Sequence, residues 1–194
     1  MTRSDAARNR ERLLAVARDA YAASPDVSLN AIAKAAGVGP GTLYRHFPTR
    51  EALVLAVYEE QIAQLVALAP ALLEEHADAP VEAMRRWLDA LGRYGRLKHG
   101  IAEVLHAAMT EAIFRSTYFS MVDALRQLLQ AGERAGAFRP GTDPDDLLLL
   151  LGFLWRMKPG EASEAQASRL IGFVLRGLGA REAAWPEPNG RGGR

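Results

Sequence analysis

Residues 28–50 read SLNAIAKAAGVGPGTLYRHFPTR, and this stretch predicts two short helices joined by a tight turn. Ser28 is a good N-cap for the first helix, because its hydroxyl can accept a hydrogen bond from a free N–H of the first turn. Gly37 suits the left-handed position that ends that helix, since glycine has no Cβ to clash there. Pro40 fits the first position of the second helix, where its missing N–H costs nothing. Thr49 can cap the helix that follows.

The spacing of apolar residues gives each helix of this unit one buried face. In the first helix these residues are Leu29, Ile32, Ala33 and Ala36, and in the second they are Leu43 and Phe47. The second helix then presents Thr42, Tyr44, Arg45 and His46 outward. A cationic and aromatic outer face on the second helix is typical of a helix-turn-helix DNA reader.

The charge of the chain is unevenly distributed. Residues 1–50 carry eight basic and four acidic side chains, whereas the remainder carries 16 basic and 19 acidic ones. A basic N-terminal end on a mildly acidic body fits a protein that touches DNA at one end only. Charge alone would also fit an ordinary surface, so this argument depends on the motif.

Several classes of protein find no support in the sequence. The absence of cysteine excludes disulfides and thiolate chemistry. The charged start MTRSDAARNRERLL lacks the apolar core of a signal peptide, and no run of about 20 apolar residues predicts a membrane span. There is no catalytic Ser/His/Asp pattern, Gly-rich phosphate loop or HExxH motif. We therefore expect a cytoplasmic protein that is not an enzyme and needs no cofactor.

The rest of the chain predicts an all-α protein of about nine helices, with no strand pattern and no repeat. The expected helices outside the motif span residues 8–23, 50–75, 81–97, 101–109, 111–135, 144–155 and 163–178. Gly95 and Gly100 should bracket a connection, and Pro70 should kink or break the fourth helix. That helix is the only continuous link between the N-terminal unit and the body. Residues 181–194 are rich in proline and glycine, and we expect them to be disordered.

The string AGVGPGTLYRHFPTREAL resembles the N-terminal domain of the TetR/AcrR family of bacterial transcriptional regulators, over roughly residues 8–60. Two later strings, RYGRLKHGIAEVL and GAFRPGTDPDDLLLLLGFL, are similar to the C-terminal domains of an SbtR-like subgroup. The resemblance implies a helix-turn-helix DNA-binding domain at residues 1–50, with its signature extending to about residue 60. It also implies a helical effector-binding and dimerisation domain at residues 51–180.

The resemblance assigns DNA contacts to the second helix of the motif and its flanks. It implies that Tyr44 and His46 donate to phosphates and that Thr42 contacts a phosphate or a base. It further implies that Arg50, at a position usually held by lysine, clamps the DNA backbone. The residue types by themselves leave two readings open: Tyr44 as a packed aromatic side chain and His46 as a helix cap.

Further candidate contacts follow from side-chain chemistry. Arg45 is the best base reader because arginine pairs bidentately with guanine, although a contact to phosphate alone stays open. Ser28 should lie close to a phosphate, and Asn30 points toward the groove from the same helix turn. Gly39 and Pro40 allow the backbone to approach the bases closely, with few hydrogen bonds and an apolar contact of Pro40 to a thymine methyl.

The N-terminal arginines offer a second mode of DNA contact. Arg3, Arg8 or Arg10 would reach the minor groove from a flexible arm. An equally good interpretation is that this segment is a solvated, frayed terminus.

Methionine and aromatic side chains of the body suggest an adaptable apolar pocket, since such residues line ligand cavities. The candidates are Met84, Trp87, Tyr94, Leu97, Ile101, Leu105, Met109, Phe114, Tyr118, Met121, Phe153 and Met157. For any one of them, ordinary core packing is the favoured interpretation. The resemblance implies a small apolar or amphipathic effector in this region.

His99, Glu103 and His106 share one helical face, which makes a metal site a remote alternative. We assign no metal, because these residues fit a plain surface equally well.

The last two predicted helices carry more apolar surface than one side of a small domain needs. The candidate dimer contacts are Leu147, Leu151, Leu154, Leu170, Ile171, Val174, Leu175 and Leu178. Two such helix pairs would form a four-helix bundle between subunits. The sequence therefore predicts a homodimeric regulator that binds a palindromic double-stranded operator as a repressor and is released by an effector. A DNA-binding dimer without an effector is the competing hypothesis.

Overall fold

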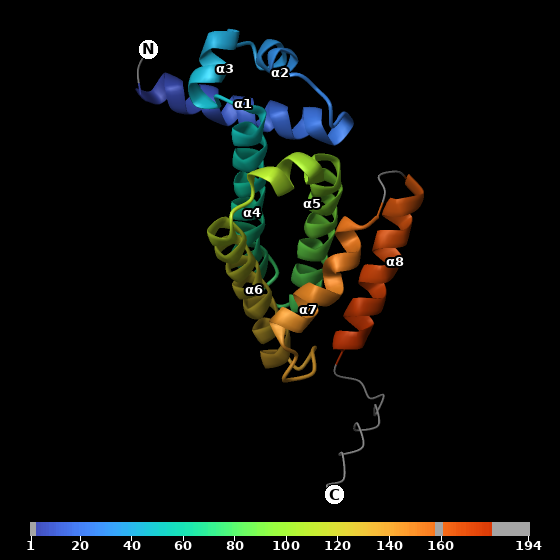
Figure 1. The fold of residues 1–194 in the computed structure, drawn as a ribbon. Coiled ribbons are helices and arrows are strands. Elements are labelled where there is room, and N and C mark those ends of the chain that lie inside the picture. The colour runs from blue at the N-terminus through green and yellow to red at the C-terminus, as the bar shows by residue number, and fades with distance from the viewer. Residues whose placement is uncertain (1–2, 158–160, 180–194) are drawn as a thin grey trace, which may run out of the picture.

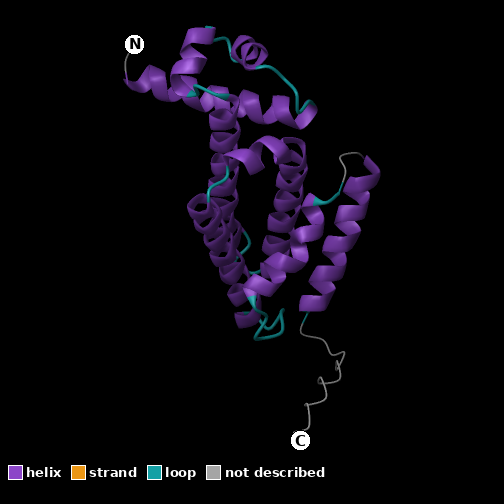
Figure 2. Cartoon of the chain, in the orientation of Figure 1, coloured by secondary structure: helices purple, strands orange, loops and turns teal. Residues whose placement is uncertain are grey.

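The structure is a computed structural model and describes residues 3–157 and 161–179. Within these residues the chain forms helices throughout, and the sole β-type contact is an isolated bridge between Phe138 and Gly179 (Figure 2). The predicted all-α fold is therefore confirmed. The C-terminal residues expected to be disordered lie outside the described residues.

Three helices form the N-terminal head: α1 (Arg3–Ala23), α2 (Leu29–Ala35) and α3 (Pro40–His46). Figure 1 shows them together at the top of the molecule, with α1 lying across the upper end of α4. The predicted local signals are confirmed. Ser28 caps α2 by accepting from the N–H of Ala31 at 3.2 Å. Gly37 has a φ of 67°, and Pro40 begins α3.

The body contains the remaining helices, namely α4 (Arg50–Glu75), α5 (Pro80–Ala108), α6 (Glu111–Arg134), α7 (Pro144–Leu150), the 3-10 helix η1 (Leu151–Trp155) and α8 (Glu161–Leu178). Helix α4 descends from the head and packs against α5 and α6, while η1 and α8 pack on the other side of α5 (Figure 1). The helices are capped as local chemistry predicts, with Thr49 accepting from Ala52 and Asp143 from Asp145.

Helix α4 is the central core helix of the body. It is long and apolar enough to cross a membrane by length and composition, contrary to the expectation that no such segment exists. Its apolar side chains are instead buried against neighbouring helices, as in the case of Leu53, Val54 and Leu65. The indole of Trp87 on α5 donates to the carbonyl of Leu65 at 2.8 Å, which fixes the two helices to each other.

The predicted break in α5 is wrong, because this helix runs unbroken for 29 residues. Two of its three glycines, Gly95 and Gly100, serve close packing instead. A Cβ on Gly95 would lie 2.8 Å from the carbonyl oxygen of Leu154 in η1. A Cβ on Gly100 would lie 3.1 Å from the carbonyl oxygen of Tyr21 in α1. Neighbouring backbone therefore approaches closely at both glycines, most closely at Gly95, and this packing outweighs the low helix propensity of glycine.

Three further helix boundaries differ from the prediction. Helix α1 begins at Arg3 rather than at Arg8, and α4 continues through Pro70 without a break. Pro70 is exposed, so the chain tolerates the loss of one hydrogen bond on the solvent side. The single helix expected over residues 144–155 tightens into η1 after Leu150.

The contact at Gly100 adds a second connection between head and body. Helix α4 is the only continuous link, as predicted, but α1 also packs directly on α5. The carbonyl of Tyr21 and the side chain of Pro25 both lie next to Gly100. The orientation of the head is thus set at two points.

Gly95→Ala is expected to lower the free energy of unfolding by about 1–3 kcal/mol, because the added methyl forces the Leu154 carbonyl to shift. Gly92→Ala is the matched control, since its Cβ would make an ordinary 3.8 Å contact with the Leu154 side chain. Helix propensity should then raise stability by up to about 1 kcal/mol. Urea unfolding measures both changes, and equal shifts in the same direction would contradict the close approach at Gly95.

Candidate DNA interface and effector pocket

The outer face of α3 is open and carries polar side chains. Tyr44 is 45% exposed, Arg45 is exposed, and Thr42 and His46 are half-buried. Gly41, in the first turn of α3, has no neighbouring atom within 4 Å of a Cβ position. The face predicted to meet DNA is therefore accessible, with its inward residues buried as expected.

Arg45 lies along its own helix in the absence of DNA. Its Nε donates to the carbonyl of Gly41 at 3.1 Å and one terminal nitrogen donates to the Thr42 hydroxyl at 3.1 Å. Both bonds are exposed, so they exchange readily with water or a base edge. Arg45 and Thr42 therefore form one polar unit on the face of α3.

The guanidinium of Arg50 points into the head, contrary to the expectation of a clamp on the DNA backbone. It donates to the carbonyl of Val27 at 2.9 Å and to the carbonyl of Pro25. Its Cζ also lies 5.4 Å from the centroid of the Tyr21 ring. Arg50 thus ties the loop between α1 and α2 to the start of α4, and its guanidinium is committed within the protein.

Tyr21 is the buried neighbour of this arginine. Its ring is fully buried, and its hydroxyl has no hydrogen-bond partner among the described residues. Burial raises the pKa of Tyr21, while the charge of Arg50 acts in the opposite direction. The ring is therefore a packing element of the head that receives the Arg50 cation.

The N-terminal arginines lie on helix α1 rather than on a flexible arm. Arg8 pairs with Asp5 at 3.0 Å, and the Cζ of Arg10 lies 5.7 Å from the centroid of the Phe47 ring. Arg12 donates to the carbonyl of Ala36 at 3.4 Å. The side chain of Arg3 lies outside what the structure describes.

The remaining candidate DNA contacts flank α3 and α2. Ser28 and Asn30 are exposed at the start of α2, and Gly39 and Pro40 are exposed at the start of α3. All four are therefore accessible to a partner.

A small cavity of about 220 Å³ lies within the body, between α4, α5, α6, α7 and η1. It is lined by Tyr58, Ile62, Tyr94, Lys98, Phe114, Thr117, Tyr118, Met121, Leu148, Leu149, Gly152 and Trp155. Most of this lining is apolar, and the hydroxyls of Tyr58 and Thr117 are hydrogen-bonded to each other at 2.9 Å. We refer to this cavity as the body pocket.

Four of the predicted pocket residues line the body pocket, namely Tyr94, Phe114, Tyr118 and Met121. The others do not. Met84, Trp87, Leu97, Ile101 and Leu105 are buried in the core, Met109 and Met157 pack on the core from its edge, and Phe153 lines a different groove. Sequence reasoning missed Tyr58, Lys98, Thr117 and Trp155, because periodicity does not reveal which buried faces leave space between them.

Three titratable groups around the body pocket have shifted pKa values. Burial lowers the pKa of Lys98, whose Nζ lies 5.3 Å from the centroid of the Trp155 ring. Burial raises the pKa of Tyr94 well above its usual range. The hydroxyl of Tyr118 donates to Asp145 at 2.7 Å, and this bond raises the pKa of Tyr118. The pocket therefore combines an apolar lining with one partly buried cation.

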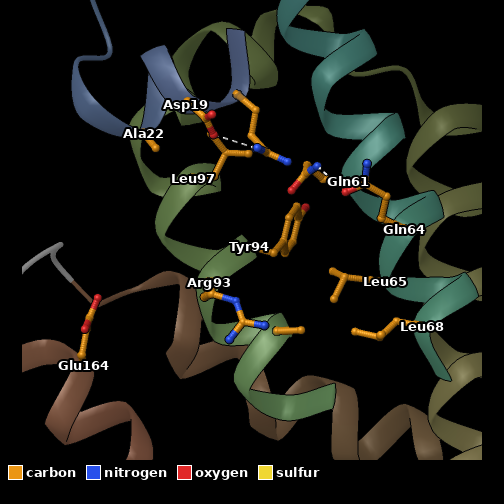
Figure 3. A pocket seen from close by; sticks show the side chains of 12 residues that line it. Asp19, Ala22, Gln61, Gln64, Leu65, Leu68, Arg93, Tyr94, Leu97 and Glu164 are labelled. Carbon is orange, nitrogen blue, oxygen red and sulfur yellow. Dashed lines mark hydrogen bonds and ion pairs between the residues drawn. The ribbon is translucent and has the colours of Figure 1, made fainter. Parts of the chain in front are cut away.

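A larger cleft of about 710 Å³ lies where the head meets the body (Figure 3). It is lined by Arg18, Asp19, Ala22, Gln61, Gln64, Leu65, Leu68, Ala90, Arg93, Tyr94, Leu97 and Glu164. Arg18 pairs with Asp19 and Gln61 donates to Gln64, so much of this cleft is lined by paired polar side chains. Tyr94 borders both cavities, and the apolar body pocket is the better match to the predicted effector site.

The three residues considered for a metal site lie in the last turns of α5. Glu103 and His106 are exposed, and the side chain of His99 lies outside what the structure describes. Among the described residues no group of three acidic, histidine or cysteine side chains is placed to hold a metal ion.

The predicted dimer contacts require a correction. Leu147, Leu151, Leu154, Ile171 and Leu178 are at most 6% exposed, so they pack within the protomer and have little surface to offer a partner. Leu170, Val174 and Leu175 are half-buried.

Three large apolar side chains are exposed on the described parts of α7 and α8, namely Leu149, Leu150 and Phe173. Phe173 and Leu150 border a groove of about 510 Å³ between the two helices, which also includes Leu170 and Val174. This groove is therefore an apolar surface available to a partner, and its lining includes the predicted residues Leu147, Leu170, Val174 and Leu178.

Comparisons with known proteins agree with the geometry of head and body. Residues 14–57 match the model of the bacterial regulatory proteins of the tetR family. Residues 79–180 match the model of the SbtR-like transcriptional regulator C-terminal domain. The first model covers most of the head and the start of α4, and the second covers the body from the start of α5 onward.

Solved structures give the same result. A TetR transcriptional regulator from Streptomyces coelicolor is 36% identical with a TM-score of 0.77, and the match covers 88% of this chain and 98% of that chain. A TetR regulator from Mycobacterium vanbaalenii is 34% identical with a TM-score of 0.73, covering 91% and 98%.

Curated relatives match over shorter lengths. A helix-turn-helix-type transcriptional regulator of Staphylococcus aureus is 35% identical over 82 residues, which is 41% of this chain and 43% of that protein. The regulator UidR of Escherichia coli is 24% identical over 142 residues, covering 71% and 72%. These relatives are transcriptional regulators, in agreement with the expectation that the chain is not an enzyme.

Arg50→Ala is expected to lower the free energy of unfolding by about 1.5–3 kcal/mol, because it removes hydrogen bonds from a charged donor to two loop carbonyls. Arg45→Ala is the matched control and should change stability by less than about 0.5 kcal/mol, since its hydrogen bonds are exposed. Urea unfolding followed by circular dichroism measures both values. Unchanged stability in Arg50→Ala, together with lost DNA binding, would restore the phosphate-clamp interpretation.

Proposed function

The chain belongs to the TetR family of bacterial transcriptional regulators, and from that premise we propose that it is a homodimeric repressor. It binds a palindromic operator and is released by a small-molecule effector. Membership of the family makes it a DNA-binding transcriptional regulator. The observation that supports the finer proposal is the open polar face of α3, on a small head that is fixed to a helical body containing an apolar pocket.

In the proposed complex, α3 enters the major groove and reads bases through Arg45, while Tyr44, His46 and Thr42 contact the flanking phosphates. The free Arg45 gives up bonds to its own helix, which are exposed and therefore weak, in exchange for a bidentate contact to guanine. Pro40 and the glycines beside it permit the backbone to approach closely. Ser28 and Asn30 lie near phosphate at the start of α2.

Residues 1–50 are the DNA-binding domain in this proposal, and residues 51–180 are the effector-binding and dimerisation domain. The boundary falls within the rigid junction at the start of α4, where Arg50 bonds to the head. The protein acts in the bacterial cytoplasm, where its operator DNA is found.

The groove between α7 and α8 is the proposed dimer surface. It exposes Leu150 and Phe173, each 61% exposed in the protomer, and apolar side chains of that size favour burial against a second copy. A two-fold dimer places two α3 helices about 34–36 Å apart, one turn of DNA, and therefore reads an inverted repeat.

Release follows from the position of the body pocket. It is lined from α4 and α5, the two helices that carry the contacts with the head. An effector that fits only one arrangement of these helices shifts the population toward that arrangement and away from the spacing that matches DNA.

The repressor proposal is tested by a salt titration of binding to the DNA immediately upstream of its own gene, against scrambled DNA of equal length. The expected result is a saturable, dimer-sized complex with the native DNA alone at physiological salt. Equal and steeply salt-dependent binding to both DNAs would leave only the nonspecific electrostatic contribution and would contradict operator recognition there.

The dimer proposal is tested by Phe173→Asp, which places a charge in the apolar groove. Sedimentation equilibrium should show the monomer for this variant and the dimer for the unaltered chain, because an unpaired charge opposes burial. Phe119→Asp is the matched control, since Phe119 is also exposed but lies on α6, away from the groove. A dimer of unchanged affinity in Phe173→Asp would refute this interface.

A further inference from the structure

The body pocket contains one cation in an otherwise apolar lining. Lys98 projects from α5 and lies beside the indole of Trp155, with Met121 and Leu148 among the neighbouring lining residues. Lys98 is half-buried, and an ammonium group there loses part of its hydration without a paired anion. The position of Lys98 therefore calls for an explanation that core packing does not supply.

No acidic side chain in the described part of the chain forms an ion pair with Lys98. Burial is the sole cause of its lowered pKa, with no contribution from a neighbouring charge. An acidic group near the pocket, Asp145, is instead hydrogen-bonded to the hydroxyl of Tyr118. The ring of Trp155 is the partner that the described residues offer the ammonium group, and a ring face offsets only part of the lost hydration.

We propose that the effector is a small amphipathic carboxylic acid whose carboxylate pairs with Lys98. This inference rests on the proposed effector function and specifies its ligand class. The apolar part of the acid packs against Ile62, Met121 and Leu148, and the hydrogen-bonded hydroxyls of Tyr58 and Thr117 border the same pocket. A charge-assisted contact in an apolar site is stronger than the same contact in water, which gives the acid its advantage over a neutral analogue.

The pocket is small and opens to solvent, since Phe114 and Leu149 in its lining are exposed. Its volume of about 220 Å³ lies below the range of about 300–1,000 Å³ that is usual for drug-sized ligands. An acid with a single ring or a short alkyl chain fits this space. Phe114 is 50% exposed, and it stacks on Tyr118 with ring centroids 5.7 Å apart at one side of the pocket.

The same segment of α5 contacts the head. Lys98 precedes Gly100 by two residues. The carbonyl of Tyr21, near the end of α1, packs against Gly100. A carboxylate that pairs with Lys98 therefore binds within one helical turn of the contact between α5 and the head. An acid effector has a short route to the DNA-binding domain that does not require α4 to move.

The test compares acids with neutral analogues of the same shape. The probes are 4-phenylbutyrate with 4-phenylbutan-1-ol, and octanoate with octan-1-ol, each titrated into the full chain while its melting temperature is followed. For at least one pair the acid should bind about tenfold more tightly than the alcohol, as expected for a charged hydrogen bond. Lys98→Met should abolish this preference, because it removes the ammonium group that pairs with the carboxylate.

Arg93→Met is the control for general loss of positive charge. Arg93 lies on the same helix but lines the larger cleft, so this variant should retain the preference for the acid. Circular dichroism of both variants verifies that they fold.

Alcohols that bind as tightly as the acids, or a preference that survives Lys98→Met, would overturn the acid assignment while leaving an effector site in place. Absence of stabilisation by every probe would also overturn it. Operator binding by the same samples reports separately on the proposed function.

Discussion

The carbonyl of Tyr21 lies against Gly100, where even a methyl group would come within 3.1 Å of it. This backbone contact between α1 and α5, together with the packing of α1 on α4, positions the DNA-reading head on the body. A second anchor, the guanidinium of Arg50, holds the loop after α1 to the start of α4. These contacts together hold α3 facing in one direction.

One helix, α5, both lines the body pocket and contacts the head. Helix α5 contributes Tyr94 and Lys98 to the body pocket and Gly100 to the contact with α1. It runs without interruption between these positions. Packed interiors transmit small shifts because they deform little. A ligand that repositions α5 slightly therefore acts directly on the contact that orients α3, in addition to any movement of α4.

Local features of the head are predictable from sequence because they depend on neighbouring residues. The caps at Ser28 and Thr49 and the left-handed Gly37 require only the chemistry of a helix end. From the sequence, Gly95 looks like a helix breaker. The backbone that packs against it belongs to η1, more than fifty residues further along the chain, so the residues around Gly95 do not reveal its role. Arg50 resembles a phosphate ligand for a similar reason, since its carbonyl partners come from a loop that precedes it by more than twenty residues.

The body pocket, too, can be predicted from the sequence only in part. Residue type identifies Tyr94 and Met121 as pocket-lining residues. Trp87 and Met84 are also large and apolar, but they are fully buried in the core. Which of them borders a space depends on how α5, α6 and η1 meet, and no periodicity encodes that. The apolar stripes of α7 and α8 are likewise recognisable, although their most regular residues form the core of the protomer and the exposed ones, such as Phe173, lie between them.

The most direct test of the central claim is the distance between the two heads of the proposed dimer, measured by pulsed electron paramagnetic resonance. The chain has no cysteine, so Ala35→Cys on the exposed end of α2 carries the only spin label in each subunit. Adding Gly100→Leu should shift or broaden the distance distribution, because the side chain displaces α1. Ala102→Leu, at an exposed position on the same helix, should leave it unchanged. A distribution that Gly100→Leu does not alter would contradict the claim that this contact orients the head.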